Sequence, residues 1–334
     1  MGQLKPALTY VQQIERLKTA HNLLITDDNK ALEILSKVNY YRLSAYGIGL
    51  VKKSDKEQYQ DGISLEHIYR IYEFDSIFRN ILIHIIEKIE IQLRTQISNY
   101  LALKYGPEGY INPDNFTNKK NKDGKLVHSS VIESFKKECD HQKKAPFVKH
   151  HVDKYDGHFP IWVAIELFTF GNLSSLYSIM KSEDQKEIAK FYDTEPKYLG
   201  SWILALVEIR NICAHYSRLY NMPLKQIPHL YTEYQKYNNG KICKIFLSLI
   251  AIKRMLNSDF RWNSFEAKFE KLMEDYNDVV ILSYMGFPEE WKRVLSNWLS
   301  VLRFIKKIEK KYIGCLLLQT TEIVIMSYWQ IFDD

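Results

Sequence analysis

The chain contains one short run with polar residues whose types could carry acid–base chemistry and stabilise negative charge, Arg210-Asn211-Ile212-Cys213-Ala214-His215. An imidazole such as that of His215 can move protons near neutral pH. The guanidinium of Arg210 is a fixed cation with several donors, which suits the extra negative charge of a phosphorane-like transition state. Asn211 can orient the histidine or bind phosphate. We therefore assign Arg210, Asn211 and His215 to a candidate catalytic site.

A predicted helix carries this run, beginning at Thr194-Glu195-Pro196 and continuing to about Tyr220. Its apolar side consists of Trp202, Ile203, Leu206, Ile209 and Cys213. Another side is polar, because Glu208, Asn211, His215 and Arg218 follow one another at offsets of 0, 3, 7 and 10 residues. We therefore predict Glu208 and Arg218 as residues that support the site.

Arg210 does not share that polar side. Five residues separate it from His215, which is about 140° of rotation at 3.6 residues per turn. Its side chain must curl round the helix, or a second helix must bring another copy of the pair close. A simpler alternative is that these side chains cap the last carbonyl groups of the helix and interact with its dipole.

The rest of the sequence predicts an all-α protein. Gly (13) and Pro (9) are sparse, Tyr (23) and Phe (16) are plentiful, and we find neither a strand pattern nor an internal repeat. The predicted helices are one that Thr9 caps, one through residues 31–38, and others over residues 65–105, 129–141, 161–170, 173–180, 194–220, 241–255 and 261–287, with a helical start to the tail at 289–302.

The longest predicted helix covers residues 65–105, which contain no Gly or Pro and lie between Ser64, a good N-cap, and Gly106-Pro107. An unbroken helix of this length would span about 60 Å. We therefore predict two helices or one bent helix. Glu90 and Arg94 are an acid-before-base pair at i,i+4, which favours a structural pair.

The segment from 112 to 160 differs in composition, with ten lysines and five of the ten histidines. We predict an exposed, basic, partly irregular insertion (about 112–159) around one short helix, 129–141. Lys119, Lys120 and Lys122 are candidates for contact with a phosphate backbone, although such lysines more often form a solvated face. The spacing of Cys139 and the nearby histidines matches no zinc pattern, so we predict no metal site.

Composition and charge place the chain among globular proteins. The net charge of +6 permits a polyanionic partner without requiring one. Four cysteines without a CxxC pair, and an N-terminus without an apolar signal region, favour the cytoplasm. Residues 313–332 are apolar but contain Glu322, so we expect no membrane span.

We predict an N-terminal helical subdomain (1–60), a helical domain (64–290) and a C-terminal helical extension (291–334).

Four blocks of the sequence resemble a known family. Arg-Asn-x-x-x-His at 210–215 resembles the RxxxxH signature of HEPN-domain ribonucleases. The blocks resemble those of the Abi family, the AbiD/AbiF-like abortive-infection proteins of bacteria, in order and over roughly residues 8–292. They are Asn-Tyr-Tyr-Arg-Leu-Ser-x-Tyr at 39–46, Ile-Glu-Ile-x-Leu-Arg-Thr-Gln-Ile at 89–97, Pro-x-Trp-x-x-x-Glu-x-x-Thr-Phe-Gly-x-Leu-Ser at 160–174, and Arg-Asn-x-Cys-Ala-His-x-x-Arg-Leu-Tyr-Asn at 210–221. One departure is Tyr216, where the family often has His.

This resemblance implies a HEPN-like helical bundle and a toxin-like endoribonuclease of phage defence. It implies metal-independent RNA cleavage through 2′-OH attack, with no cofactor. HEPN sites are typically built from two facing helices, which implies a homodimer with two Arg/His pairs around one phosphate. The resemblance also raises a small noncoding RNA antitoxin as a partner. We expect neither a membrane nor DNA as a partner.

Several alternatives remain open at this point. The same surface can belong to a non-catalytic RNA-binding or interaction protein. Glu166 is either a partner of Arg210 or Arg218, or part of a buried structural ion pair. Tyr41 and Arg42 are RNA contacts, or the tyrosines of 39–46 pack in the core. Arg94 is a further RNA candidate, although a structural role is favoured.

Overall fold

The computed structural model describes residues 6–238, 244–256 and 260–296, and the chain divides into two compact units, 1–289 and 290–334. Every regular element in the described ranges is helical, and the β features there are isolated bridges. The all-α prediction is therefore confirmed. The helices are α1 (Tyr10–Thr19), α2 (Asp28–Lys37), α3 (Tyr40–Ser44), α4 (Leu65–Tyr105), α5 (Val127–His141), α6 (Pro146–Tyr155), α7 (Ile161–Ala164), α8 (Phe170–Ile179), α9 (Ser182–Phe191), α10 (Pro196–Ala214), α11 (Ile245–Met255), α12 (Phe260–Asp275) and α13 (Trp291–Leu295), with short 3₁₀ turns η1 (Ala45–Gly47), η2 (Pro113–Asn115), η3 (Ile165–Leu167), η4 (Thr232–Tyr237) and η5 (Leu282–Met285).

Helix α4 is the central element of the first unit. Its 41 residues form one helix rather than two, because no Gly or Pro interrupts them. The hydroxyl of Ser64 accepts a hydrogen bond from the backbone N–H of His67 (3.0 Å) and begins the helix. Gly106, at φ +82°, ends it. One continuous helix therefore reaches both ends of the unit.

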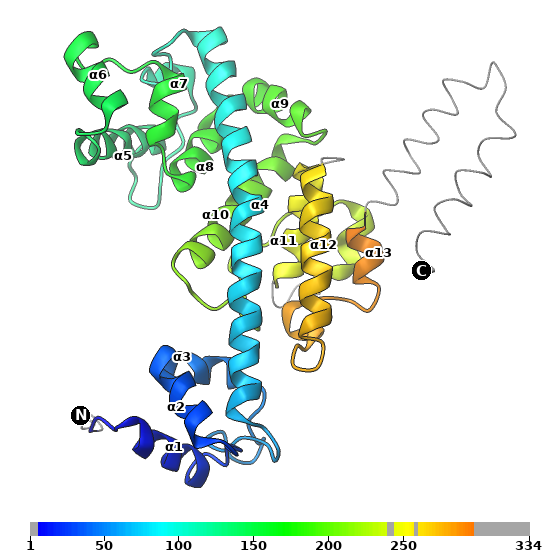
Figure 1. Ribbon diagram of the computed structural model, residues 1–334. Coiled ribbons are helices and arrows are strands. Elements are labelled where there is room, and N and C mark those ends of the chain that lie inside the picture. Colours follow the sequence, from blue (N-terminus) through cyan, green and yellow to red (C-terminus); the bar gives the residue numbers. More distant parts are fainter. Residues whose placement is uncertain (1–5, 239–243, 257–259, 297–334) are drawn as a thin grey trace, which may run out of the picture. The chain divides into compact units, whose positions relative to one another are not determined.

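The other helices of this unit gather along α4, as Figure 1 shows. Helices α1 to α3 lie at its N-terminal end, and α5 to α8 lie at its C-terminal end. Helices α10 and α12 pack against its middle. The apolar side predicted for α10 is buried, including Trp202, Leu206 and Ile209. Helix α4 thus brings α3 and the end of α10 onto one common support.

Some predicted boundaries differ from the observed ones. The segment 112–160 holds the predicted helix, now α5, and a second helix, α6, which Pro146 begins at its first turn. Phe135 and Val148 are buried and α5 packs against α8, so this segment contributes to the core. Helix α9 was not predicted, because its short polar sequence carries little apolar periodicity. The predicted helix over 261–287 ends at Asp275.

The second unit contains one described helix, α13. The part of the predicted helical tail beyond residue 296, and the apolar stretch 313–332, lie outside the described residues. Within the described ranges, no helix is both long enough and apolar enough to cross a bilayer.

Asp184 links α9 to α4, and its carboxyl group should make the free energy of unfolding depend on pH. The carboxylate is fully buried and accepts hydrogen bonds from Lys104 Nζ (2.5 Å), Tyr100 Oη (2.8 Å) and Tyr105 Oη (2.8 Å). Burial alone would raise the pKa of Asp184, but these three donors outweigh it and hold the pKa below its ordinary value of 3.8.

Replacing Asp184 by asparagine should therefore lower the free energy of unfolding by about 1.5–3 kcal/mol at pH 7. A depressed carboxyl pKa stabilises the fold above the unfolded-state pKa, and this contribution disappears as pH falls through the folded-state pKa. Urea unfolding of the natural protein and the variant should show the full difference in the free energy of unfolding at pH 7. This difference should become smaller below about pH 4. If it stayed constant across this pH range, the lowered pKa assigned to Asp184 would be contradicted.

Candidate functional site at the end of helix α10

Helix α10 ends immediately before His215, and a specific motif ends it. The backbone N–H of Tyr216 donates to the carbonyl of Cys213 (3.2 Å), and that of Ser217 donates to the carbonyl of Ile212 (2.9 Å). Tyr216 adopts the left-handed conformation, with φ +55°. This is the Schellman arrangement, which turns the chain away from the helix axis. The prediction that α10 continues to about Tyr220 is therefore wrong, and Arg218 does not share a helix face with Asn211 and His215.

The three predicted catalytic residues occupy the last turn of α10 and its C-cap, and all three are accessible to solvent. Asn211 and His215 are exposed, and the Arg210 side chain retains 36% of its accessible surface. Within the described residues, no hydrogen bond or ion pair joins Arg210 to His215, and neither Asn211 nor His215 uses its side chain to cap a carbonyl. The capping alternative therefore has no support from hydrogen bonds. The imidazole is open to a ligand.

Cys213, in the middle of the run, has a different role. It is 5% exposed and belongs to the apolar side of α10. Burial raises the pKa of its thiol to about 12. A thiol in this state is a packing group rather than a nucleophile.

Arg210 is held from α4 by Glu90. The Oε2 atom of Glu90 lies 3.6 Å from Nε of Arg210, and its Oε1 accepts from Nη2 of Arg94 at 2.6 Å. The structural pair predicted between Glu90 and Arg94 is thus present, and it extends to Arg210. Sequence reasoning missed that extension. The available signal was a lone acidic residue on the apolar side of a long helix, which implies a cationic partner from elsewhere.

Arg94 is fully engaged within the protein. Its guanidinium also donates to the carbonyl oxygens of Ile165 and of Phe168 (2.7 Å to the latter), and the side chain is only 11% exposed. These contacts do not support its predicted role in binding RNA, because the side chain is largely buried and both Nη atoms already donate within the protein. Instead, Arg94 fixes Glu90 and thereby the position of Arg210.

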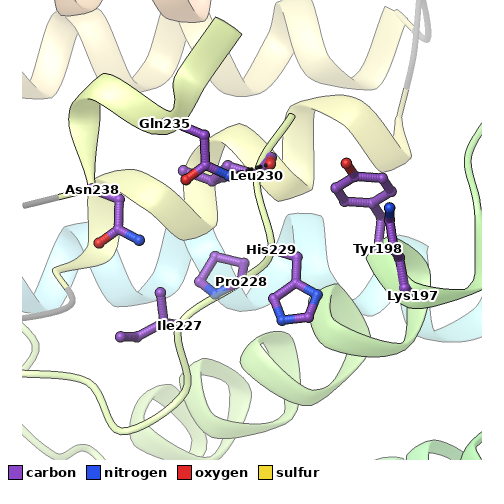
Figure 2. Close-up of a pocket in the computed structure, with 8 residues that line it drawn as sticks. All are labelled: Lys197, Tyr198, Ile227, Pro228, His229, Leu230, Gln235 and Asn238. Carbon is purple, nitrogen blue, oxygen red and sulfur yellow. Dashed lines mark hydrogen bonds between the residues drawn. The ribbon is translucent and has the colours of Figure 1, made fainter. Parts of the chain in front are cut away.

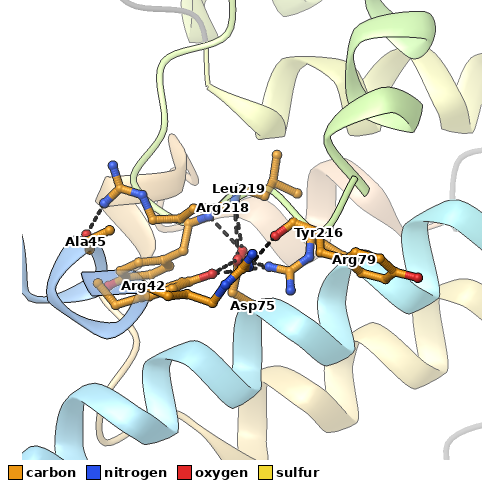
Figure 3. Close-up of polar contacts among 9 residues, drawn as sticks. Arg42, Ala45, Asp75, Arg79, Tyr216, Arg218 and Leu219 are labelled. Carbon is orange, nitrogen blue, oxygen red and sulfur yellow. Dashed lines mark hydrogen bonds and ion pairs between the residues drawn. The ribbon is translucent and has the colours of Figure 1, made fainter. Parts of the chain in front are cut away.

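The loop that follows His215 is anchored to α4 through Asp75, as Figure 3 shows. We call residues 216–221 the anchored loop. Asp75 is fully buried and accepts from the backbone N–H groups of Leu219 (3.2 Å) and Tyr220 (2.7 Å). It also accepts from Tyr46 Oη (2.7 Å) and from Arg79. Burial raises the pKa of the Asp75 carboxyl, and the Arg79 guanidinium opposes that rise.

The segment from α3 to Ile48 also anchors this loop. Arg42 Nη1 donates to the carbonyl oxygen of Tyr216 (2.6 Å), and Arg218 donates back to the carbonyl oxygen of Ala45 (Figure 3). Asn221 Nδ2 donates to the carbonyl oxygen of Ile48 (3.3 Å). The first and last of the four resembling blocks therefore meet around the anchored loop. Arg42 is exposed, so it keeps donors available while it holds Tyr216.

A family model described as Abi-like protein matches residues 33–221, which is more than half of the chain. The chain belongs to the Abi-like protein family. The predicted family is therefore confirmed, over a shorter stretch than the predicted 8–292. The match begins within α2 and ends at Asn221, so it includes Glu90, Asp75 and the anchored loop. Membership suggests abortive-infection phage defence. No curated protein and no solved structure matches the chain.

Glu166 and Glu208, which were predicted to support the site in this Abi-like protein, make no hydrogen bond or ion pair with Arg210, Asn211 or His215 in the described residues. Glu166 is exposed on η3 and makes no ion pair among the described residues, so neither of its predicted pairings is observed. The reason is that residues 161–170 break into α7 and η3, and Glu90 pairs with Arg210 instead. Glu208 accepts from the backbone N–H groups of Lys225 (2.9 Å) and Gln226 (2.8 Å). It therefore fixes the chain beyond the anchored loop.

The remaining RNA candidates are exposed. Tyr41 is 87% exposed and does not pack in the core, whereas Tyr46 is buried. Lys119, Lys120 and Lys122 lie on the segment before α5, where Lys119 Nζ donates to Ser178 Oγ (3.3 Å). These lysines stay candidates for phosphate contact.

A pocket near the N-terminal end of α10 in this Abi-like protein is separate from the Arg210 site (Figure 2). Its lining includes the first turn of α10 and residues 227–230, with Gln235 and Asn238. The His229 backbone there is already bonded, because its N–H donates to Ser201 Oγ (2.6 Å) and its carbonyl accepts from Trp202 Nε1 (2.6 Å). Across the described parts of the chain, no group of three or more His, Cys, Asp or Glu residues is arranged to hold a metal ion.

Proposed function

We propose that this Abi-like protein is a metal-independent endoribonuclease that acts in abortive infection and cleaves RNA at Arg210 and His215. One observation carries the proposal. The end of α10 presents an exposed imidazole close in sequence to a guanidinium that Glu90 holds in place, beside a loop anchored from two sides. Fixed donors placed where charge develops are the main requirement for stabilising a phosphoryl transition state.

The reaction that fits these groups is transesterification within RNA. A neutral imidazole of His215 accepts the proton of a ribose 2′-OH, whose oxygen then attacks the adjacent phosphorus. The bond from phosphorus to the 5′-oxygen breaks, and that oxygen takes a proton from a second group. The products are a 2′,3′-cyclic phosphate and a free 5′-OH. Arg210 stabilises the added negative charge, and Asn211 binds a phosphate oxygen or orients the imidazole.

A second copy of the chain completes this site in our proposal. Among the described residues of one copy, no hydrogen bond or ion pair joins Arg210 to His215, and His215 lies at the exposed end of the helix. Two such ends related by a two-fold axis would bring two imidazoles to one phosphate, so that one accepts a proton and the other donates one. A small noncoding RNA that occupies the same surface would act as an inhibitor.

The test is incubation of the purified protein with end-labelled RNA in EDTA, beside a variant with both Arg210→Ala and His215→Ala. We expect cleavage by the natural protein alone, with 3′ ends that resist phosphatase until acid opens the cyclic phosphate. DNA of the same sequence should stay intact, because it lacks the 2′-OH. Cleavage that requires added Mg²⁺ would contradict the proposal. Equal RNA retention by both proteins without cleavage would favour a non-catalytic RNA-binding protein.

A further inference from the structure

Tyr216 combines a disfavoured backbone conformation with an exposed ring. Five non-glycine residues in the described ranges have positive φ, and four of them are Asn or Asp, which tolerate this region. Tyr216 (φ +55°) is the exception, at a helix-ending position where glycine is strongly preferred. Its side chain is 69% exposed, so burial of the ring does not compensate for the strain. Strain in a bulky residue points to a role for its side chain.

The residues around Tyr216 fix its backbone, whereas its ring is exposed to solvent. Its N–H donates to Cys213, its carbonyl accepts from Arg42, and Asp75 holds the two amides at Leu219 and Tyr220. Within the described residues, its hydroxyl makes no hydrogen bond and its ring has no aromatic or cationic contact. Tyr216 directly follows His215, so their Cα atoms are about 3.8 Å apart. The backbone of Tyr216 is therefore fixed next to His215, while its ring is exposed and accessible to a ligand.

We propose that Tyr216 is a stacking site for a nucleobase of single-stranded RNA, adjacent to the phosphate at Arg210 and His215. This inference rests on the proposed RNA substrate. A base stacks on an exposed aromatic face whatever its identity, so the site would select single strands without selecting a sequence. Because the backbone is already fixed, binding of a base restricts only the side-chain rotation of Tyr216. Arg42, which grips the Tyr216 carbonyl and stays exposed, is placed to contact the neighbouring phosphate.

The experiment compares Tyr216→Gly, Tyr216→Phe and Tyr216→Trp in a His215→Ala background, in which RNA cleavage should be too slow to interfere with the binding measurement. The probe is fluorescein-labelled 12-nucleotide oligoadenylate, and fluorescence anisotropy gives the Kd. We expect Tyr216→Gly to weaken binding by about 10-fold or more, and the Phe and Trp variants to retain it, because stacking needs a ring but not a hydroxyl. Tyr10→Ala, which removes another partly exposed tyrosine, is the matched control and should leave the Kd unchanged.

A melting experiment separates loss of stacking from loss of folding. Glycine relieves the positive-φ strain, so Tyr216→Gly should raise Tm by about 2–4 °C while it weakens binding of the single strand. A duplex RNA of the same length should bind with the same Kd whether or not the protein carries Tyr216→Gly, because its bases are paired and cannot stack on the ring.

Two outcomes would overturn the stacking site. One is a Kd for Tyr216→Gly within twofold of the Kd measured with the tyrosine in place. The other is a changed oligomeric state by light scattering together with the weaker binding, which would assign the ring to a contact between copies. Either result leaves RNA cleavage by the natural protein intact. Failure of the natural protein to cleave RNA would instead count against the proposed function, so the two failures are distinguishable.

Discussion

Replacement of His215 by alanine should lower kcat for RNA cleavage by about 10²–10⁴-fold. The proposed reaction moves two protons, and no other described side chain at the end of α10 offers an imidazole. The exposed position of His215 means that its removal leaves no cavity in the core. KM should change little, because Arg210 and the anchored loop stay in place. Initial rates with end-labelled RNA over a range of concentrations give both constants.

His141→Ala is the matched control for this variant. The His141 side chain is 77% exposed on α5, so it tests the loss of an exposed imidazole far from the site in sequence. It should leave kcat and KM unchanged. If His215→Ala retained kcat within about threefold, His215 would not be the proton-transfer group that general acid–base catalysis requires.

Replacement of Asp75 by asparagine should lower the free energy of unfolding by about 3–5 kcal/mol. The substitution leaves the Arg79 guanidinium, which is 4% exposed, without its buried counter-ion. It also places an amide where two backbone N–H groups and the Tyr46 hydroxyl need acceptors. Urea unfolding measures the loss. The anchored loop should loosen as well, so cleavage should fall even under conditions in which the variant stays folded.

Two further variants show whether the buried pair is responsible. Asp278→Asn makes the same chemical change in a surface pair with Arg70, where the side chains are 53% and 37% exposed, and should lower the free energy of unfolding by less than about 1 kcal/mol. Adding Arg79→Met to Asp75→Asn should recover part of the loss, because it removes the unpaired charge. Equal losses from Asp75→Asn and Asp278→Asn would refute this account of the pair.

The two ends of helix α4 were predictable, and the end of α10 was not, for a physical reason. Ser64, Gly106 and the absence of breakers between them define α4 in the sequence itself. The end of α10 uses Tyr216 in the left-handed position that glycine normally occupies, so the sequence carries no stop signal. The predicted helix therefore extends to Tyr220 and places Arg218 on the wrong element.

The candidate site was only partly accessible to sequence reasoning. Arg210, Asn211 and His215 could be proposed as candidates, because the family resemblance identifies side chains; their catalytic role stays a prediction. The partners of Arg42 and Arg218 could not be predicted from the sequence, because both side chains donate to main-chain carbonyl oxygens, which every residue possesses. The ion pair between Glu90 and Arg210 joins α4 to α10, and such long-range contacts leave no periodic signal within either helix.

The hydrogen bonds between the segment 42–48 and the anchored loop have a consequence for sequence divergence. Arg42, Arg218 and Asn221 hold the peptide oxygens of Tyr216, Ala45 and Ile48, and none of these bonds involves the side chain of the residue that is held. Tyr216 and Ile48 are also more than half exposed to solvent. Natural variants can therefore exchange residues at positions 48 and 216, and so alter what the surface recognises, while the scaffold beneath retains its geometry.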